Sequence, residues 1–413
     1  MRKIYYIFLT PLFLYGQNLE ELINLSIQNR LVNASTQNLE SVKDEYKSVK
    51  SGYLPSLDLN GKYGIAETET QSLAKKAGTV NASLNYTLYD GGKKSDVYDS
   101  YESTIKSSEE SLESLKNGIS LTVVNYYFNY LSLVAQKEAK LKEIEQLESQ
   151  MLRLSRFLDA GTTTEDEVQK IVSSVENANV NLQEIELEIV TILHNLEYIT
   201  GSKVDITSGS NIKELEELSK NAERFDIKSL EYDVQTKLSN AKAQKSGYLP
   251  TITLDNTYSY YDNNFDNKAY ESNANALDHQ NITSANLSWN IFSFGETKYK
   301  YESAYKSYLA SKLNYEYEKN KANVDLQLAI RAYEISKTKI KSAEANLKAA
   351  ESAYEVIKSK FENGLVDNVA YLQSLSEKFD ALSQLKTSIN DLEIKKANII
   401  YNSGKKLEEY IKW

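Results

Sequence analysis

The chain has 413 residues, of which 41% are hydrophobic and 26% charged, and a formal net charge of −10; this is the composition of a folded chain long enough for two or three domains. The charges are spread along Glu- and Lys-rich segments without a basic patch, which excludes nucleic acid as an expected partner. Cysteine does not occur, and this excludes disulfides, a thiolate nucleophile and a zinc–thiolate site.

Residues 1–16 have the pattern of a secretory signal peptide. Arg2 and Lys3 form a basic start, an apolar run covers residues 4–14, and the small residue Gly16 follows. This run is too short to cross a bilayer as a helix, and no later stretch approaches the roughly 20 apolar residues that a crossing needs. Any insertion of the mature chain into a membrane is therefore expected to use strands.

One segment of the sequence occurs twice. Residues 51–60, SGYLPSLDLN, return as residues 246–255, SGYLPTITLD. Pro55 and Pro250 lie at the same place in both copies, and proline suits a junction where a helix stops and an extended strand begins. The separation of the copies is 195 at these prolines but 203 for Gly161 and Gly364 and for Gly201 and Gly404, so the second half has eight more residues between its strands.

Each half predicts the order helix, strand, strand, long helix, turn, long helix. The expected organisation is a signal peptide at 1–16, a first repeat at 17–204, a linker at 205–221, a second repeat at 222–404 and a C-terminal tail at 405–413.

Residues 80–88 alternate between an apolar and a polar face, as do residues 57–65 and 285–291, and a weaker alternation begins at Ile252. Strands of about nine to eleven residues with two such faces are typical of a water-filled membrane barrel. Four strands cannot close on themselves in lipid, so several copies must share one barrel. Three copies leave room for a polar lumen, whereas two would fill it with side chains.

From Lys93 to about Asp159 the sequence has no proline and one glycine, which predicts a helix of about 67 residues, roughly 100 Å long at ~1.5 Å per residue. After Gly161 an apolar residue recurs at alternating spacings of three and four from Val168 to Ile199, the pattern of a coiled coil. The second half repeats this seam, with interruptions at Lys386 and Lys396. Each half therefore predicts an antiparallel helical hairpin with its turn at Gly161 or Gly364.

The order, duplication and spacing of these motifs resemble the TolC family of outer-membrane efflux proteins over essentially the whole mature chain. The motifs are the signal peptide, the doubled Gly-Tyr-Leu-Pro, the Tyr-Asp-Gly-Gly of residues 89–92, and the segments 157–161 and 361–364 that precede the returning helices. The resemblance implies a mixed α and β membrane protein, a homotrimer with a twelve-stranded β-barrel in the outer membrane of a Gram-negative bacterium and an α-barrel in the periplasm.

The resemblance also implies a function. It is that of a passive, gated exit duct for small molecules or proteins, driven by an inner-membrane pump of the RND, ABC or MFS type together with a periplasmic adaptor. The transport process that the channel serves could be drug efflux, metal-ion efflux or type I protein secretion, and the sequence does not distinguish among these three. Two other classes compete: a periplasmic adaptor, which would have one hairpin and compact β-domains, and a structural coiled-coil tether, which would leave the two-faced strands unexplained.

The resemblance places the entrance of the duct at the hairpin turns, where acidic side chains form a ring in this family. The residues at these positions are, in the first turn, Glu165, Asp166 and Glu167, and in the second turn Asp367, with Gln373 where an acid is expected. Such a ring would favour cations. The acids could equally serve the first turn of a helix, where carboxylates offset the helix dipole and residues 162–164 supply a cap.

Five aromatic residues are expected at strand ends, where they would form an interfacial girdle or else pack on the tops of the helices. They are Tyr86, Tyr89, Trp289, Phe292 and Phe294. His194 and His279 are the only histidines and show no ligand spacing, so no metal site, cofactor or catalytic centre is expected.

Overall fold

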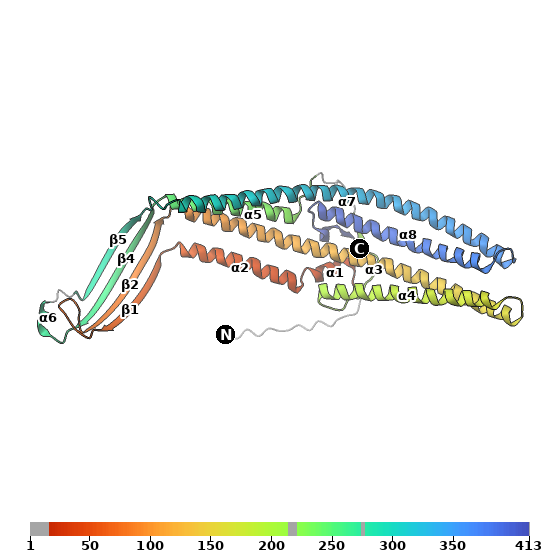
Figure 1. The fold of residues 1–413 in the computed structure, drawn as a ribbon, viewed down its shortest axis with the longest axis horizontal. Helices are drawn as coiled ribbons and strands as arrows, with labels where there is room; N and C mark the ends of the chain where they lie inside the picture. Colours follow the sequence, from red (N-terminus) through yellow and green to blue (C-terminus); the bar gives the residue numbers. More distant parts are fainter. Residues whose placement is uncertain (1–15, 214–220, 274–276, 413) are drawn as a thin grey trace. The chain divides into compact units, whose positions relative to one another are not determined.

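The structure, a computed structural model, describes residues 16–213, 221–273 and 277–412 (Figure 1). The predicted signal peptide therefore lies, except for Gly16, outside the described residues, as does part of the predicted linker. Among the described residues, no helix combines the length and the hydropathy that crossing a membrane requires.

Both halves contain the predicted order of elements. In the first half, α1 (Leu19–Ser26) and α2 (Arg30–Gly52) precede β1 (Ser56–Ile65), β2 (Lys76–Tyr89), α3 (Lys93–Asp159) and α4 (Glu165–Thr200). In the second half, α5 (Phe225–Gln244) and the 3₁₀ turn η1 (Lys245–Tyr248) precede β4 (Thr251–Asn264), α6 (Lys268–Asn273), β5 (His279–Ser288), α7 (Glu296–Glu362) and α8 (Asn368–Asn402). The linker contains β3 (Asn211–Ile212), and the chain ends with η2 (Leu407–Tyr410) and β6 (Ile411–Lys412).

The contacts divide the chain into two compact units. The helical unit consists of Met1–Ser35, Leu112–Phe225 and Lys319–Trp413, and the strand unit of Thr36–Ser111 and Asp226–Glu318. Helices α3 and α7, each of 67 residues, contribute to both units. Of the eight additional residues of the second half, four lengthen β4, which has 14 residues where β1 has ten, and four lengthen the connection from β4 to β5, in which α6 forms.

The strand unit contains one antiparallel sheet with the order β1-β2-β4-β5. Its polar face runs across β1, β2 and β4, because Asp58 pairs with Ser83, and Ser83 with Thr257. On the opposite face Leu57 and Leu59 expose 74% and 75% of their surface. The two-faced pattern predicted from the sequence is therefore present in the sheet.

The strand predicted at residues 285–291 ends earlier than expected. β5 stops at Ser288, which pairs with Thr251 of β4, so Trp289 and Ile291 lie outside the strand. The physical reason is Pro250, which has no N–H to donate and therefore ends the ladder on β4. β4 itself, the weakest case in the sequence, is 14 residues long.

The main core of the helical unit joins α1, α3, α4 and α8 to the linker and the C-terminal segment. Its fully buried members include Leu22, Val123, Phe128, Leu196, Ile400 and Leu407. Tyr127 is also buried there, and its hydroxyl donates to the carbonyl of Thr207 (2.8 Å) and accepts from the N–H of Ser210 (3.3 Å). The described parts of the linker and the tail thus contribute to this core through Ile206, Ile212, Leu407 and Ile411.

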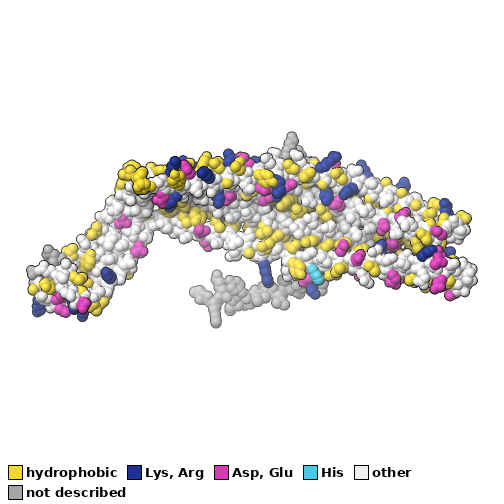
Figure 2. All heavy atoms as spheres, viewed as in Figure 1, with side chains coloured by type: hydrophobic (Ala, Val, Ile, Leu, Met, Phe, Trp, Pro, Cys, Tyr) yellow, Lys and Arg dark blue, Asp and Glu magenta, His cyan; other side chains and the backbone are white. Residues whose placement is uncertain are grey.

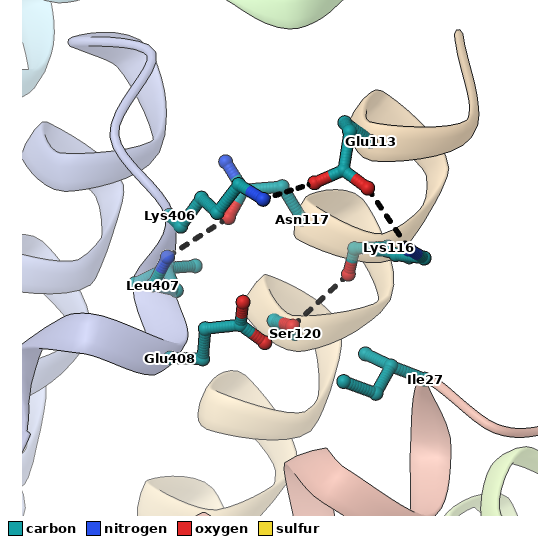
Figure 3. A pocket seen from close by; sticks show the side chains of 8 residues that line it. All are labelled: Ile27, Glu113, Lys116, Asn117, Ser120, Lys406, Leu407 and Glu408. Carbon is teal, nitrogen blue, oxygen red and sulfur yellow. Dashed lines mark hydrogen bonds and ion pairs between the residues drawn. The ribbon is translucent and has the colours of Figure 1, made fainter. Parts of the chain in front are cut away.

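A side chain of α3 holds the C-terminal segment at two backbone groups. The Asn117 amide donates to the carbonyl of Lys405 and accepts from the N–H of Leu407, both at 3.0 Å, and Figure 3 shows the bond with Leu407. Beside it, Glu113 forms ion pairs with Lys406 and with Lys116. Burial acts to raise the pKa of Glu113, but these two lysines outweigh it and hold the pKa below its usual value.

A buried ion pair on α8 holds the linker. The Glu393 carboxylate accepts from the N–H of Ile212 (2.7 Å), and Lys396 donates to Glu393 (2.7 Å) and to the Ile212 carbonyl (3.4 Å). Their side chains expose only 9% and 14% of their surface. Lys396 interrupts the predicted apolar seam because its ammonium group binds the linker at Ile212. Ile212 pairs in turn with Ile411 of β6.

Candidate functional site at the hairpin turns

The turns of the two hairpins are built in the same way. Gly161 and Gly364 have left-handed backbones with φ of 69° and 72°. The following N–H groups of Thr162 and Leu365 donate to the carbonyls of Phe157 and Lys360, each at 2.8 Å. These bonds satisfy carbonyls that the end of a helix leaves free, and glycine adopts the left-handed conformation without steric cost. The tight reversals predicted at both glycines are present.

The acids of the first turn are partly neutralised by a lysine. Lys170 donates to Asp166 (3.1 Å) and to Glu167 (3.0 Å) from one turn further along α4. Lys170 is not among the residues predicted for the entrance, although its spacing of three and four residues from the acids is the spacing at which helical residues meet. Glu165 is exposed. The turn therefore carries less negative charge than its three carboxylates suggest.

The cap expected from residues 162–164 does not form as predicted. Thr164 occupies the N-cap position without bonding a helix N–H, and its hydroxyl donates instead to the Asp166 carboxylate (2.5 Å). The Thr162 hydroxyl bonds back to the Phe157 carbonyl. The Thr164 hydroxyl, and after it Lys170, hold the pKa of Asp166 below its usual value, because both bonds favour the charged carboxylate.

The second turn uses its carboxylate as a cap. Asp367 accepts from the N–H of Ala370 (2.9 Å) at the start of α8. Gln373 donates to Glu377 one turn further along (2.7 Å). In the second turn, the Asp367 carboxylate is thus bonded to its own helix. Gln373 has a neutral amide at a position where the family pattern suggests a further acid.

A groove of about 610 Å³ lies between the two hairpins near these turns. Lys170 of α4 and Gln373 of α8 both line it, together with Lys140 and Glu143 of α3. The wall formed by α4 is polar and consists of Ser173, Ser174, Asn177 and Asn181, with Ala178 among them. The structure therefore brings Gln373 and Lys170 to one groove, whereas Glu165, Asp166, Glu167 and Asp367 do not line it.

The aromatic residues at the strand ends differ between the halves. Tyr86 is partly buried and Tyr89 is 41% exposed, whereas Trp289, Phe292 and Phe294 are 54%, 73% and 89% exposed. Hydrophobic side chains gather where the strands meet the helices (Figure 2). Phe294 has a left-handed backbone with φ of 50°, and it stands at the repeat position that glycine occupies in the first half.

Neither histidine forms part of a metal centre among the described residues, where no cluster of three or more His, Asp or Glu side chains could hold a metal ion. His279 stacks on Tyr258 with ring centres 6.3 Å apart, and His194 is exposed on α4.

Comparison with known proteins identifies the family. The family model described as "Outer membrane efflux protein" matches residues 22–202 and 219–400, so the chain belongs to the outer membrane efflux protein family. This confirms the resemblance seen in the sequence. The protein is thus a channel subunit of an efflux system, lies in the outer membrane and extends into the periplasm. Its family consists of channel-forming proteins.

Solved structures share the fold at low sequence identity. The CmeC outer membrane channel of Campylobacter jejuni is 18% identical with a TM-score of 0.83, and the match covers 94% of this chain and 85% of that one. A membrane protein from Pseudomonas aeruginosa is 16% identical, with a TM-score of 0.83 and coverage of 94% and 93%. The outer membrane protein VceC of Vibrio cholerae is 14% identical, with a TM-score of 0.81 and coverage of 94% and 96%. No curated protein matches the sequence.

Proposed function

We propose that three copies of this chain form one gated exit duct, in which their strands close into a single twelve-stranded barrel. The observation that carries this proposal is the sheet, in which β1 and β5 are both edge strands. An open edge cannot face lipid, because its unpaired N–H and carbonyl groups would be buried without partners. The apolar face would then contact lipid and the polar face would line the lumen.

The two tandem repeats, at 17–204 and 222–404, would give each copy two hairpins, and three copies would assemble six hairpins into the periplasmic tunnel. The linker at 205–221 and the tail at 405–413 would brace this tunnel through Asn117 and Glu393. Trp289, Phe292 and Phe294, with Tyr86 and Tyr89, would form the aromatic girdle at the membrane surface.

The duct is passive and catalyses no reaction in this proposal. An inner-membrane pump of the RND, ABC or MFS type would supply the energy, and a periplasmic adaptor would connect the pump to the hairpins. The groove near the turns supports an adaptor contact, because it is open between two helical hairpins and is lined by short polar side chains that a third hairpin could approach closely. Small molecules and proteins both fit a polar lumen.

The acidic first turn would act as the cation-attracting ring of the entrance. Glu165, Asp166 and Glu167 from three copies would surround the opening, with Asp367 and Gln373 of the second turn beside them. Lys170 offsets part of this charge. The prediction is that Asp166→Asn combined with Glu167→Gln weakens block of the conductance by La³⁺ in planar bilayers, because two carboxylates per copy are removed.

The matched control is Lys170→Gln, which should strengthen the same block because it removes the cation paired with both acids. Lowering the pH from 7 to 5 should leave the contribution of Asp166 to the block intact, since the hydrogen bonds from Thr164 and Lys170 hold the pKa of this carboxylate below its usual value. Block that is unaffected by all three substitutions would place the constriction elsewhere in the chain.

A further inference from the structure

The residues that follow β5 lie outside the sheet of a single chain. β5 ends at Ser288, and the large apolar side chains of Trp289, Ile291 and Phe292 after it are exposed. The corresponding residues of the first repeat, 86–89, are the last four residues of β2. The two repeats therefore differ in structure here, although their sequences align at this point without a gap.

Within each repeat the two strands pair in the same register. Ser56 pairs with Asn85 in the first repeat, and Thr251 pairs with Ser288 in the second. Thr251 has the repeat position of Ser56, and Ser288 has that of Asn85. In both repeats the pairing stops there, because a proline precedes the first strand. A pairing seen in one repeat thus transfers residue by residue to the other.

Residues 86–89 are held in β2 by the other repeat. The pairing of β2 with β1 stops before them, and their partners lie on β4, where Thr87 is opposite Thr253 and Tyr89 is opposite Ile252. The pairing of β2 with β4 joins the end of one repeat to the start of the next. The corresponding strands at the other end of each repeat are β5 and β1, which lie at the two edges of the sheet (Figure 1).

We propose that residues 289–292 become a strand on assembly and pair with the start of β1 in the next copy, in the register that joins β2 to β4 within one chain. Three copies form a ring of six repeats, so the joints between copies repeat the joints inside them. The transferred register places Asn290 opposite Asp58 of the next copy, and Phe292 opposite Leu57. Backbone groups of the edge strand β1 thereby find partners, as lipid requires.

The side chains that meet in this register match in character. Trp289 faces Leu59 of the next copy on the apolar face, where Leu59 is exposed in a single chain. Asn290 faces Asp58 on the polar face, and its amide can donate to this carboxylate as the Asn85 amide does within one chain (3.3 Å). A shift by one residue would set Trp289 opposite Asp58, because it moves every side chain to the other face.

The inference rests on the proposed trimer and adds to it which residues of two copies meet. It also explains why the alternation of apolar and polar residues in the sequence continues beyond Ser288. The strand predicted at residues 285–291 is complete only when the next copy supplies β1. Pro250 ends the pairing with β4, and the neighbouring chain holds the remaining residues from the opposite side.

Disulfide cross-linking tests the register, because the chain contains no cysteine of its own. Opposite residues of antiparallel strands have Cα atoms about 4.5–5.5 Å apart, which a disulfide can bridge, whereas a shift of two residues separates them by roughly 8 Å, which it cannot. The double variant Asp58→Cys, Asn290→Cys is oxidised with copper phenanthroline in outer membranes. In denaturing electrophoresis it should then run at two and three times the mass of the chain, and a reductant should restore the single-chain mass.

Matched cysteine pairs provide the controls. Thr87→Cys with Thr253→Cys occupies the equivalent positions of the joint inside one chain. This pair should close an intramolecular disulfide, seen as loss of maleimide labelling at an unchanged single-chain mass. Asn290→Cys combined with Ser56→Cys or with Asn60→Cys represents a register shifted by two residues in either direction, and both combinations should stay at the mass of one chain.

The outcomes separate the register from the trimer. Cross-linking of a shifted pair in place of Asp58 with Asn290 would overturn the register while the shared barrel stands. A native complex of three chains in which residue 290 forms no cross-link, although the internal pair closes, would overturn the strand between copies alone. A monomeric native mass would overturn the trimer and this inference together.

Discussion

Gly404→Ala is expected to destabilise the protein by about 2–5 kcal/mol, the combined size of overpacking and of a left-handed alanine. Gly404 ends the second repeat with φ of 74°, and a Cβ added to it would lie 2.0 Å from the Glu223 carbonyl oxygen and 2.2 Å from its carbon. Both atoms belong to backbone, which cannot rotate away as a flexible side chain does. The segment before α5 would have to move away from the end of α8.

The corresponding position in the first repeat provides the control. Gly201 has nearly the same backbone, with φ of 73°, but a Cβ added there meets no heavy atom within 4 Å. Gly201→Ala should therefore cost only the backbone term, about 1–2 kcal/mol. Chemical unfolding of the two purified variants in detergent measures the difference. Equal destabilisation would show that the approach of Glu223 is not what requires glycine at 404.

Glu393→Ala is expected to cost about 3–5 kcal/mol, the usual effect of removing one partner of a buried ion pair. The substitution leaves the Lys396 ammonium buried and removes the acceptor of the Ile212 N–H. The linker would lose its bond to α8, and β6, which pairs with β3, would lose support with it. Increased cleavage of the linker by a protease should accompany the loss of stability.

A less buried ion pair on the same helix serves as the reference for this substitution. Asp391 and Lys395 form an ion pair at 3.0 Å, with 28% and 31% of their side-chain surfaces exposed. Asp391→Ala should cost about 0–1 kcal/mol, because water replaces the lost partner. The free energies of unfolding of the two variants test this prediction. Similar losses of stability would mean that the linker does not depend on Glu393.

The long helices and their turns could be predicted closely from the sequence. α3 begins and ends at Lys93 and Asp159, because its residues contain no proline and glycines flank both ends. Gly161 and Gly364 predicted the positions of the two turns, because glycine readily adopts the left-handed conformation that ends a helix. The duplicated motif revealed the second hairpin, and the difference between 195 and 203 located the extra residues in the strand pair of the second half. These features are local or periodic, so the sequence displays them directly.

The bracing of the linker and tail could not be predicted. Asn117 and Glu393 are single polar residues on long helices, and nothing periodic distinguishes them from solvated neighbours. Their partners are backbone groups of segments 288 and 181 residues away in the chain. Lys170 was within reach of sequence reasoning, since its spacing from Asp166 and Glu167 is the ordinary one for a helical ion pair. The partners of the candidate entrance residues otherwise depend on tertiary packing.

The mass of the native complex tests the central claim most directly. The protein should be extracted from outer membranes by detergent and not by salt, because the apolar face of its sheet contacts lipid in the proposed barrel. Native mass spectrometry of the extracted protein should then give three times the mass of the mature chain, since two edge strands per copy leave a four-stranded sheet open. A monomer, or protein released by salt alone, would contradict the account.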